Sequence, residues 1–155
     1  MNIQSINHNK IIFTLILLFS FLSPVYAEQV NYPSNLWQGL IAEDTRGDYQ
    51  TYLAIASVVR NRLDKGMDNG LVALKRQNLR QFVKQNCDYI LKTKGIDLAK
   101  LATKAIQEVW QGNDFANGAT NYEHTGVYPI PKYTRKMKLV KVIYAHTKNE
   151  IKFWK

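Results

Sequence analysis

The chain has 155 residues and a formal charge of +9, from 21 Lys and Arg against 12 Asp and Glu. That length fits one domain, and a hydrophobic fraction of 46% is that of a globular protein rather than a disordered one. The one cysteine, Cys87, excludes an intrachain disulfide framework and a cysteine-rich zinc site. We expect this lone thiol to be buried and inert.

The first 27 residues have the order of a secretory signal. A polar start with Lys10 precedes the apolar run Ile11–Leu22, and Pro24 and small residues ending at Ala27 follow. The run is shorter than the ~20 residues of a membrane-spanning helix. We therefore predict a signal peptide over residues 1–27; a retained membrane anchor is the alternative.

Removal of the signal peptide leaves one domain over residues 28–155, with a formal charge of +8. The predicted location is exported: the periplasm, the extracellular space or the cell wall, without stable membrane insertion. A basic exported protein meets anionic partners such as cell wall, lipid headgroups, lipopolysaccharide or nucleic acid. Its aromatic residues do not alternate with basic ones as a stacking platform requires, so we expect no nucleic-acid partner.

Hydrophobic periodicity predicts a mainly helical domain. Four segments have helical spacing: residues 36–46, 49–65, 71–86 and 97–112. The third is expected to break near Asn78. The middle of the second, Tyr52–Val59, has almost no polar face, which predicts a central helix buried on all sides.

The remaining segments predict the smaller, non-helical part. Residues 89–95 are expected to be irregular, and the Gly-, Asn- and Pro-rich residues 113–131 to form a loop or short hairpin. The basic segment 133–147 fits a helix or a strand equally. The predicted fold class is thus α+β, mainly α, as a single domain with a small loop or β part.

Glu43 is the first candidate for catalysis. It lies at the end of the first predicted helix, beside the apolar residues Leu40–Ala42 and a glycine break. Desolvation at an apolar surface favours a neutral carboxyl, the form that a general acid for glycosidic cleavage needs. A solvated surface Glu is the competing interpretation. Glycoside hydrolysis normally needs a second carboxylate, for which Asp44 and Asp48 are candidates.

A second candidate site follows the fourth helix. Gly118 and Thr120 are small residues that allow close approach to the backbone, and Asn121 and Tyr122 add an amide and an aromatic ring. These groups suit sugar recognition, through hydrogen bonds to hydroxyl and acetamido groups and ring stacking; a plain turn before a core Tyr is the alternative.

Two other chemistries remain open. His124 and His146 with Glu123 have the composition of a zinc site with two His and one carboxylate, although no His-Glu-x-x-His motif is present. A dyad of Cys87 with a histidine is formally possible.

The two segments 41–47 and 53–62 resemble the signature of bacterial cell wall hydrolases of the spore cortex-lytic type. In that family a catalytic Glu ends one helix, a Gly-containing turn follows, and a buried Ala/Val-rich helix closes in Asn-Arg, here Asn61-Arg62. Later elements of the family resemble, in order, residues 80–82 around Gln81, residues 105–114 and 118–122, and His146 with Phe153. The family's second acidic residue, four after the Glu, is replaced by Gly47, and Asp48 is its nearest substitute.

The resemblance implies a lysozyme-like fold and cleavage of the peptidoglycan glycan strand between N-acetylmuramic acid and N-acetylglucosamine. Domains of this family are similar to lytic transglycosylases, in which one Glu acts first as the acid and then as the base. The resemblance thus implies that Glu43 is catalytic and that no cofactor or metal is needed. Two sets of residues follow from it: Gly118, Thr120, Asn121 and Tyr122 for the sugar, and Asp48, Asn61, Arg62, Gln81 and His146 as supports, with Asn61 and Arg62 expected to support the helix of Glu43.

Two alternatives to this function stay open. One is a zinc amidase or peptidase acting on the stem peptide through His124, Glu123 and His146. The other is a non-enzymatic wall-binding protein on a degenerate hydrolase fold, suggested by the glycine at position 47.

Overall fold

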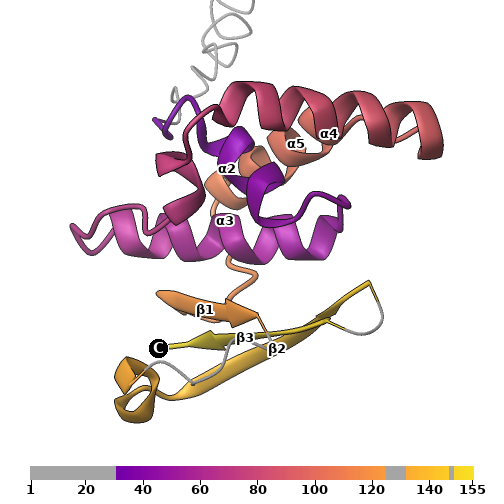
Figure 1. Ribbon diagram of the computed structural model, residues 1–155. Helices are drawn as coiled ribbons and strands as arrows, with labels where there is room; N and C mark the ends of the chain where they lie inside the picture. The colour runs from indigo at the N-terminus through magenta and orange to yellow at the C-terminus, as the bar shows by residue number, and fades with distance from the viewer. Residues whose placement is uncertain (1–30, 125–131, 147–148) are drawn as a thin grey trace, which may run out of the picture. The chain divides into compact units, whose positions relative to one another are not determined.

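The computed structural model describes residues 31–124, 132–146 and 149–155, and Tyr32–Lys155 form a compact unit (Figure 1). The predicted signal peptide over residues 1–27 lies outside the described residues. The described elements are helices α2 (Leu36–Glu43), α3 (Tyr49–Leu63), α4 (Leu79–Lys94) and α5 (Leu98–Trp110), 3₁₀ turns η1 (Val72–Lys75) and η2 (Lys132–Lys136), and strands β1 (Asn121–His124), β2 (Leu139–Ala145) and β3 (Asn149–Trp154). This mixed, mainly helical content confirms the predicted α+β class. In the described ranges, no helix has the length and apolar character to cross a membrane.

Helix α3 lies between the other helices and the sheet (Figure 1). Every residue from Thr51 to Val59 is buried. Tyr52 and Ile55 belong to the core shared with α2, α4 and α5, whereas Ala54 and Val58 belong to a second core between α3 and the sheet. The predicted central helix is confirmed, because an apolar surface on all sides is covered by two different layers.

The sheet has three antiparallel strands in the order β1-β3-β2. The central strand β3 was not predicted; its buried residues Ile151 and Phe153 alternate with partly exposed ones. Phe153 is paired with Tyr122 of β1. The segment that fitted helix or strand equally is a strand over Leu139–Ala145, preceded by η2.

Helix α4 differs most from expectation. The break near Asn78 is confirmed, since this residue has a left-handed backbone (φ 62°) before the first turn. The helix then continues to Lys94, so the prediction of an irregular segment over residues 89–95 is wrong. Neither Gly nor Pro interrupts this stretch, Val83 and Ile90 are buried on one face, and Gly95 ends it with a left-handed backbone (φ 68°).

Candidate functional site

Helix α2 ends at Glu43 because the next residue turns the chain. Asp44 has an extended backbone (φ −133°), and its carboxylate accepts the backbone N–H of Arg46 (3.2 Å) and of Asp48 (2.8 Å). Such local bonds compete with helical hydrogen bonds, which explains why the helix stops short of residue 46. The buried Tyr52 hydroxyl donates to the Asp44 carbonyl (2.8 Å). Glu43 is thus attached to a turn fixed by three hydrogen bonds.

The same turn explains why no acid stands four residues after Glu43. Gly47 has φ +77°, and a Cβ there would lie 2.4 Å from Cδ2 of Leu98. Asp48, the expected substitute, caps α3: its Oδ1 accepts the backbone N–H (2.7 Å) and the hydroxyl (2.8 Å) of Thr51. Its role is therefore structural, and it does not line the cleft described next.

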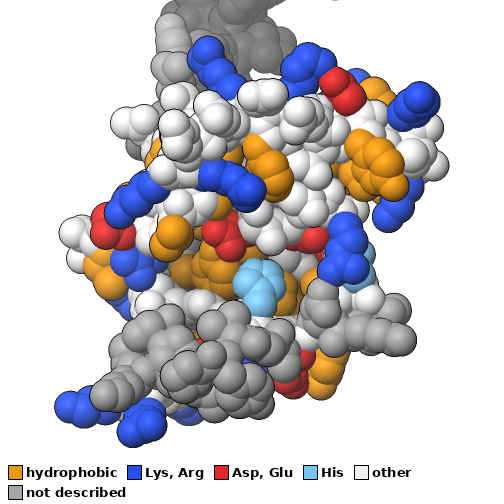
Figure 2. Space-filling view, viewed as in Figure 1, with side chains coloured by type: hydrophobic (Ala, Val, Ile, Leu, Met, Phe, Trp, Pro, Cys, Tyr) orange, Lys and Arg blue, Asp and Glu red, His pale blue; other side chains and the backbone are white. Residues whose placement is uncertain are grey.

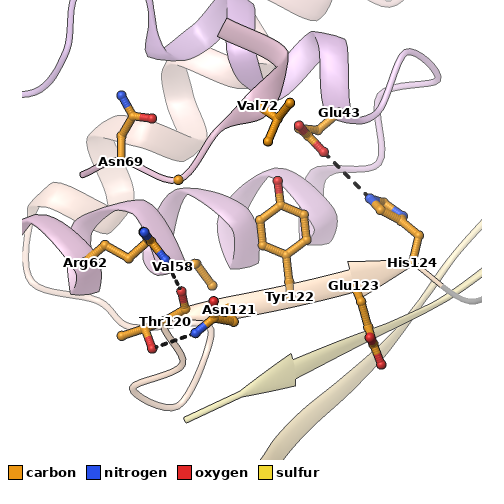
Figure 3. A pocket seen from close by; sticks show the side chains of 11 residues that line it. Glu43, Val58, Arg62, Asn69, Val72, Thr120, Asn121, Tyr122, Glu123 and His124 are labelled. Atoms are coloured by element: carbon orange, nitrogen blue, oxygen red, sulfur yellow. Dashed lines mark hydrogen bonds and ion pairs between the residues drawn. The ribbon is translucent and has the colours of Figure 1, made fainter. Parts of the chain in front are cut away.

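Glu43 lies in a cleft of about 290 Å³ between α2, the segment around η1, and β1 (Figure 3). Tyr122 and His124 point from β1 into this cleft, while Glu123 between them points away. The Glu43 side chain is 17% exposed. The lining residues are Glu43, Val58, Arg62, Asn69, Gly70, Val72, Thr120, Asn121, Tyr122, Glu123 and His124.

Across the cleft, His124 faces Glu43. Its Nε2 lies 3.9 Å from Oε2 of Glu43 (Figure 3). The imidazole edge packs on Tyr122, with ring centroids 6.0 Å apart and planes at 82°, and Tyr122 in turn lies beside Phe153 at 6.2 Å. His124 was not predicted to face Glu43, because nothing in the periodicity of the sequence places β1 opposite the end of α2.

Two further hollows adjoin Glu43. One is a small polar crevice of about 130 Å³, which is also lined by Asp44, Arg46, His124 and His146. The other is a shallow hollow of about 420 Å³, lined also by Val72, Ala73, Lys75 and Arg76. Figure 2 shows a hollow across this face with acidic and histidine side chains inside it and basic side chains on its upper rim. Glu43 lines the cleft and both adjoining hollows.

His146 ties the sheet to the turn after Glu43. Its Nε2 lies 3.1 and 3.2 Å from the two carboxylate oxygens of Asp44, whose side chain is 8% exposed. His146 directly follows β2 and has a left-handed backbone (φ 52°). His146, which was expected to be a supporting residue, therefore contacts the turn after Glu43 through the Asp44 carboxylate.

Asn61 and Arg62 support a different element from the one expected. The Asn61 amide donates to the carbonyl of Ala119 (3.1 Å), and Arg62 donates to the carbonyl of Thr120 (3.0 Å). Arg62 also donates to Asp68, to its carbonyl (2.8 Å) and to its carboxylate (2.9 Å). Both side chains therefore hold the start of β1 and not helix α2. Strand β1 lines the side of the cleft opposite Glu43.

The other predicted residues divide into two groups. Thr120 and Asn121 line the cleft, and the Asn121 amide donates to the Thr120 hydroxyl (3.1 Å). Gly118 lies outside the cleft lining, with φ +74° and its N–H donating to Asp114 (2.5 Å). Gln81 is exposed on α4 and does not line the cleft either.

The described residues support neither of the two alternative chemistries. Within the described ranges, no group of three His, Cys, Asp or Glu side chains is arranged to hold a metal ion, so His124, Glu123 and His146 do not form a zinc site. Burial, with the nearby Asp97 carboxylate, raises the pKa of the Cys87 thiol. That shift disfavours the thiolate that a nucleophile needs.

No protein-family model and no curated protein matches the sequence, and no solved structure matches the chain.

Proposed function

We propose that the chain is an exported enzyme that cleaves the glycan strand of peptidoglycan as a lytic transglycosylase, on a lysozyme-like arrangement of helices and sheet. Export is inferred from the secretory-signal pattern of residues 1–27. The observation that carries the proposal is the position of Glu43, a partly buried carboxyl at a helix end in an elongated hollow, facing the polar and aromatic side chains of β1.

The shape of the site supports a polymeric substrate. The cleft and the shallow hollow are joined at Glu43 and Val72, so a chain of sugar rings has room on both sides of the carboxyl. Lys75 and Arg76 are exposed at the shallow hollow, where they would attract the carboxylates of muramyl groups or stem peptides. The guanidinium of Arg76 lies 3.8 Å from the ring centroid of Phe82, which restrains its position.

The resemblance implies a reaction that needs one acid. The Glu43 carboxyl protonates the glycosidic oxygen, the bond from this oxygen to C1 of the muramyl residue breaks, and the electron pair stays on the oxygen. The muramyl 6-hydroxyl oxygen then bonds to C1, and its proton passes to the Glu43 carboxylate. A 1,6-anhydro ring closes, and no water is consumed. Tyr122 and Asn121 orient the sugar from β1. The zinc alternative is not proposed, because its residues lie apart.

The proposal is tested by mass spectrometry of the products that the purified protein releases from purified peptidoglycan. Soluble muropeptides with anhydro-muramyl ends are expected. Glu43→Gln keeps the shape of the side chain and removes its proton, so the rate should fall by about 10²- to 10⁴-fold. Glu108→Gln is the matched control, because Glu108 is a Glu on α5 whose carboxylate accepts from Tyr49 outside the cleft.

Each other result would favour one of the alternatives to this function. Reducing ends in place of anhydro ends would make the enzyme a hydrolase. Release that is insensitive to Glu43→Gln would refute the assignment of Glu43. Binding to insoluble wall without any product would favour the non-enzymatic reading.

A further inference from the structure

We propose that the catalytic unit is the pair of Glu43 and His124, in which His124 is the base that takes the proton of the attacking hydroxyl. This inference rests on the proposed function and replaces its single-residue chemistry with a two-residue one. It gives His124 a catalytic role beside Glu43 that was not predicted from the sequence.

The geometry of the two side chains carries the proposal. They come from opposite walls of the cleft, Glu43 from the end of α2 and His124 from the end of β1. The gap of 3.9 Å between Oε2 and Nε2 is too long for a direct hydrogen bond. Both atoms therefore face the same space, and a sugar hydroxyl placed there can contact both. At 36% exposure, the imidazole is accessible from the cleft.

The fold fixes the imidazole in this place. His124 is paired with Ile151 in the ladder between β1 and β3, and Ile151 is fully buried. The ring of Tyr122 packs against the ring of His124 in an edge-on arrangement. Such support from a strand and a neighbouring ring is what keeps a catalytic group in register with its partner.

Two of the other charged groups near His124 contact each other, and a third is exposed. In the polar crevice beside it, Asp44 and His146 contact each other, and Arg46 is an exposed residue of the turn. The remaining charged side chain of that crevice is Glu43. Among the described residues, the one ion-pair contact of His124 is with Glu43, at 3.9 Å.

In the main cleft, the other two charged side chains are also directed elsewhere. Arg62 donates to Asp68 and to the carbonyl of Thr120. Glu123 points to the opposite face of β1 (Figure 3). Glu43 is thus the charged partner toward which His124 is directed.

In the proposed reaction, Glu43 and His124 each transfer one proton. Glu43 gives its proton to the glycosidic oxygen as the bond to C1 breaks, and the leaving sugar departs with a free hydroxyl. The 6-hydroxyl oxygen bonds to C1, and its proton passes to Nε2 of His124. Once the product has left, a water molecule in the gap relays this proton from the imidazolium to the Glu43 carboxylate, so the pair holds one proton before and after each turnover.

The test compares kcat and KM against pH for the full chain and its His124→Asn variant, using soluble glycan strands from peptidoglycan freed of stem peptides. The wild-type rate should fall on both sides of an optimum, because the pair must carry one proton. His124→Asn should lower kcat by about 10²- to 10³-fold, leave KM near the wild-type value and abolish the acid-side fall. Tyr144→Asn, on the exposed face of β2, is the control that should change none of these.

Failure of this inference is distinguishable from failure of the proposed function. A His124→Asn variant with wild-type kcat and pH profile, alongside an inactive Glu43→Gln, would leave the function intact and refute the role of His124. A rise in KM alone would make His124 a binding residue and refute it equally. An active Glu43→Gln would refute both. Should circular dichroism show that His124→Asn is unfolded, His124→Gln takes its place with the same criteria.

Discussion

The contact between His146 and Asp44 joins the sheet to the turn that carries Glu43, and its removal should be measurable. His146→Ala deletes an imidazole nitrogen 3.1 and 3.2 Å from the oxygens of a carboxylate that is 8% exposed. A hydrogen bond to a charged group contributes about 1.5–3 kcal/mol. We expect the free energy of unfolding to fall by about 2 kcal/mol, a large share of the roughly 5–15 kcal/mol of a native domain.

A second substitution at the same position separates the contact from the backbone. His146 has φ 52°, which costs a residue with a Cβ about 1–2 kcal/mol and glycine nearly nothing. His146→Gly loses the same contact but removes this cost, while its freer unfolded chain opposes the gain by about 0.4–1 kcal/mol. The Gly variant should therefore be more stable than the Ala variant by about 0.5–1 kcal/mol.

Urea unfolding followed by tryptophan fluorescence measures both variants, with Asp44→Asn completing a double-mutant cycle. A coupling free energy of about 1–2 kcal/mol is expected between positions 44 and 146. His146→Ala and Asp44→Asn should also lose activity, because the turn at Asp44 positions Glu43. Strictly additive effects, or a His146→Ala variant as stable as the wild type, would refute the reasoning.

Two further predictions concern residues around α3. Gly47→Ala should cost about 2–4 kcal/mol in urea unfolding, because it combines φ +77° with a Cβ 2.4 Å from Leu98; a variant of wild-type stability would show that the turn relaxes freely. Burial, then the hydrogen bond and charge of Glu108, raise the pKa of Tyr49 from 10.0 to about 12. The folded state thus holds this proton more tightly, so the stabilisation is complete below pH 10 and lost as the pH rises toward 12. Tyr49→Phe should flatten the fall in unfolding free energy across that range; a curve as steep as that of the wild type would contradict it.

The helical part of the fold was readable from the sequence because its signals are local. Tyr52–Val59 lacks a polar face and is buried on all sides. The helix predicted over residues 97–112 is α5, Leu98–Trp110, and Asp97 caps it by accepting the Lys100 N–H (3.1 Å). The error in α4 has a local cause too. The third helix was expected to end at residue 86 and residues 89–95 to be irregular, but no Gly or Pro lies between residue 79 and Gly95 to end the helix earlier.

The candidate site was only partly readable, because it is made by tertiary contacts. Glu43 was found from its place at a helix end and from the resemblance. Its neighbour His124 was missed as a partner, since the two are brought together by the pairing of β1 with β3, and β3 itself was not predicted. Asn61 and Arg62 were identified, but their partners depend on where the 114–120 loop folds back, which periodicity does not encode.

The acids near Glu43 bear on the stereochemistry of the proposed reaction. Asp44 accepts hydrogen bonds from its own turn and contacts His146, and Asp48 caps α3. Glu123 points away from the cleft, with its Oε2 buried and unpaired. Routes that use a second carboxylate as nucleophile or as base for water need one placed across the glycosidic bond. None of these three described acids is so placed, so under the proposed function a proton taken from the attacking hydroxyl passes to His124 or back to Glu43. We therefore expect ring closure by the substrate's own hydroxyl, with anhydro ends as the product that mass spectrometry should detect.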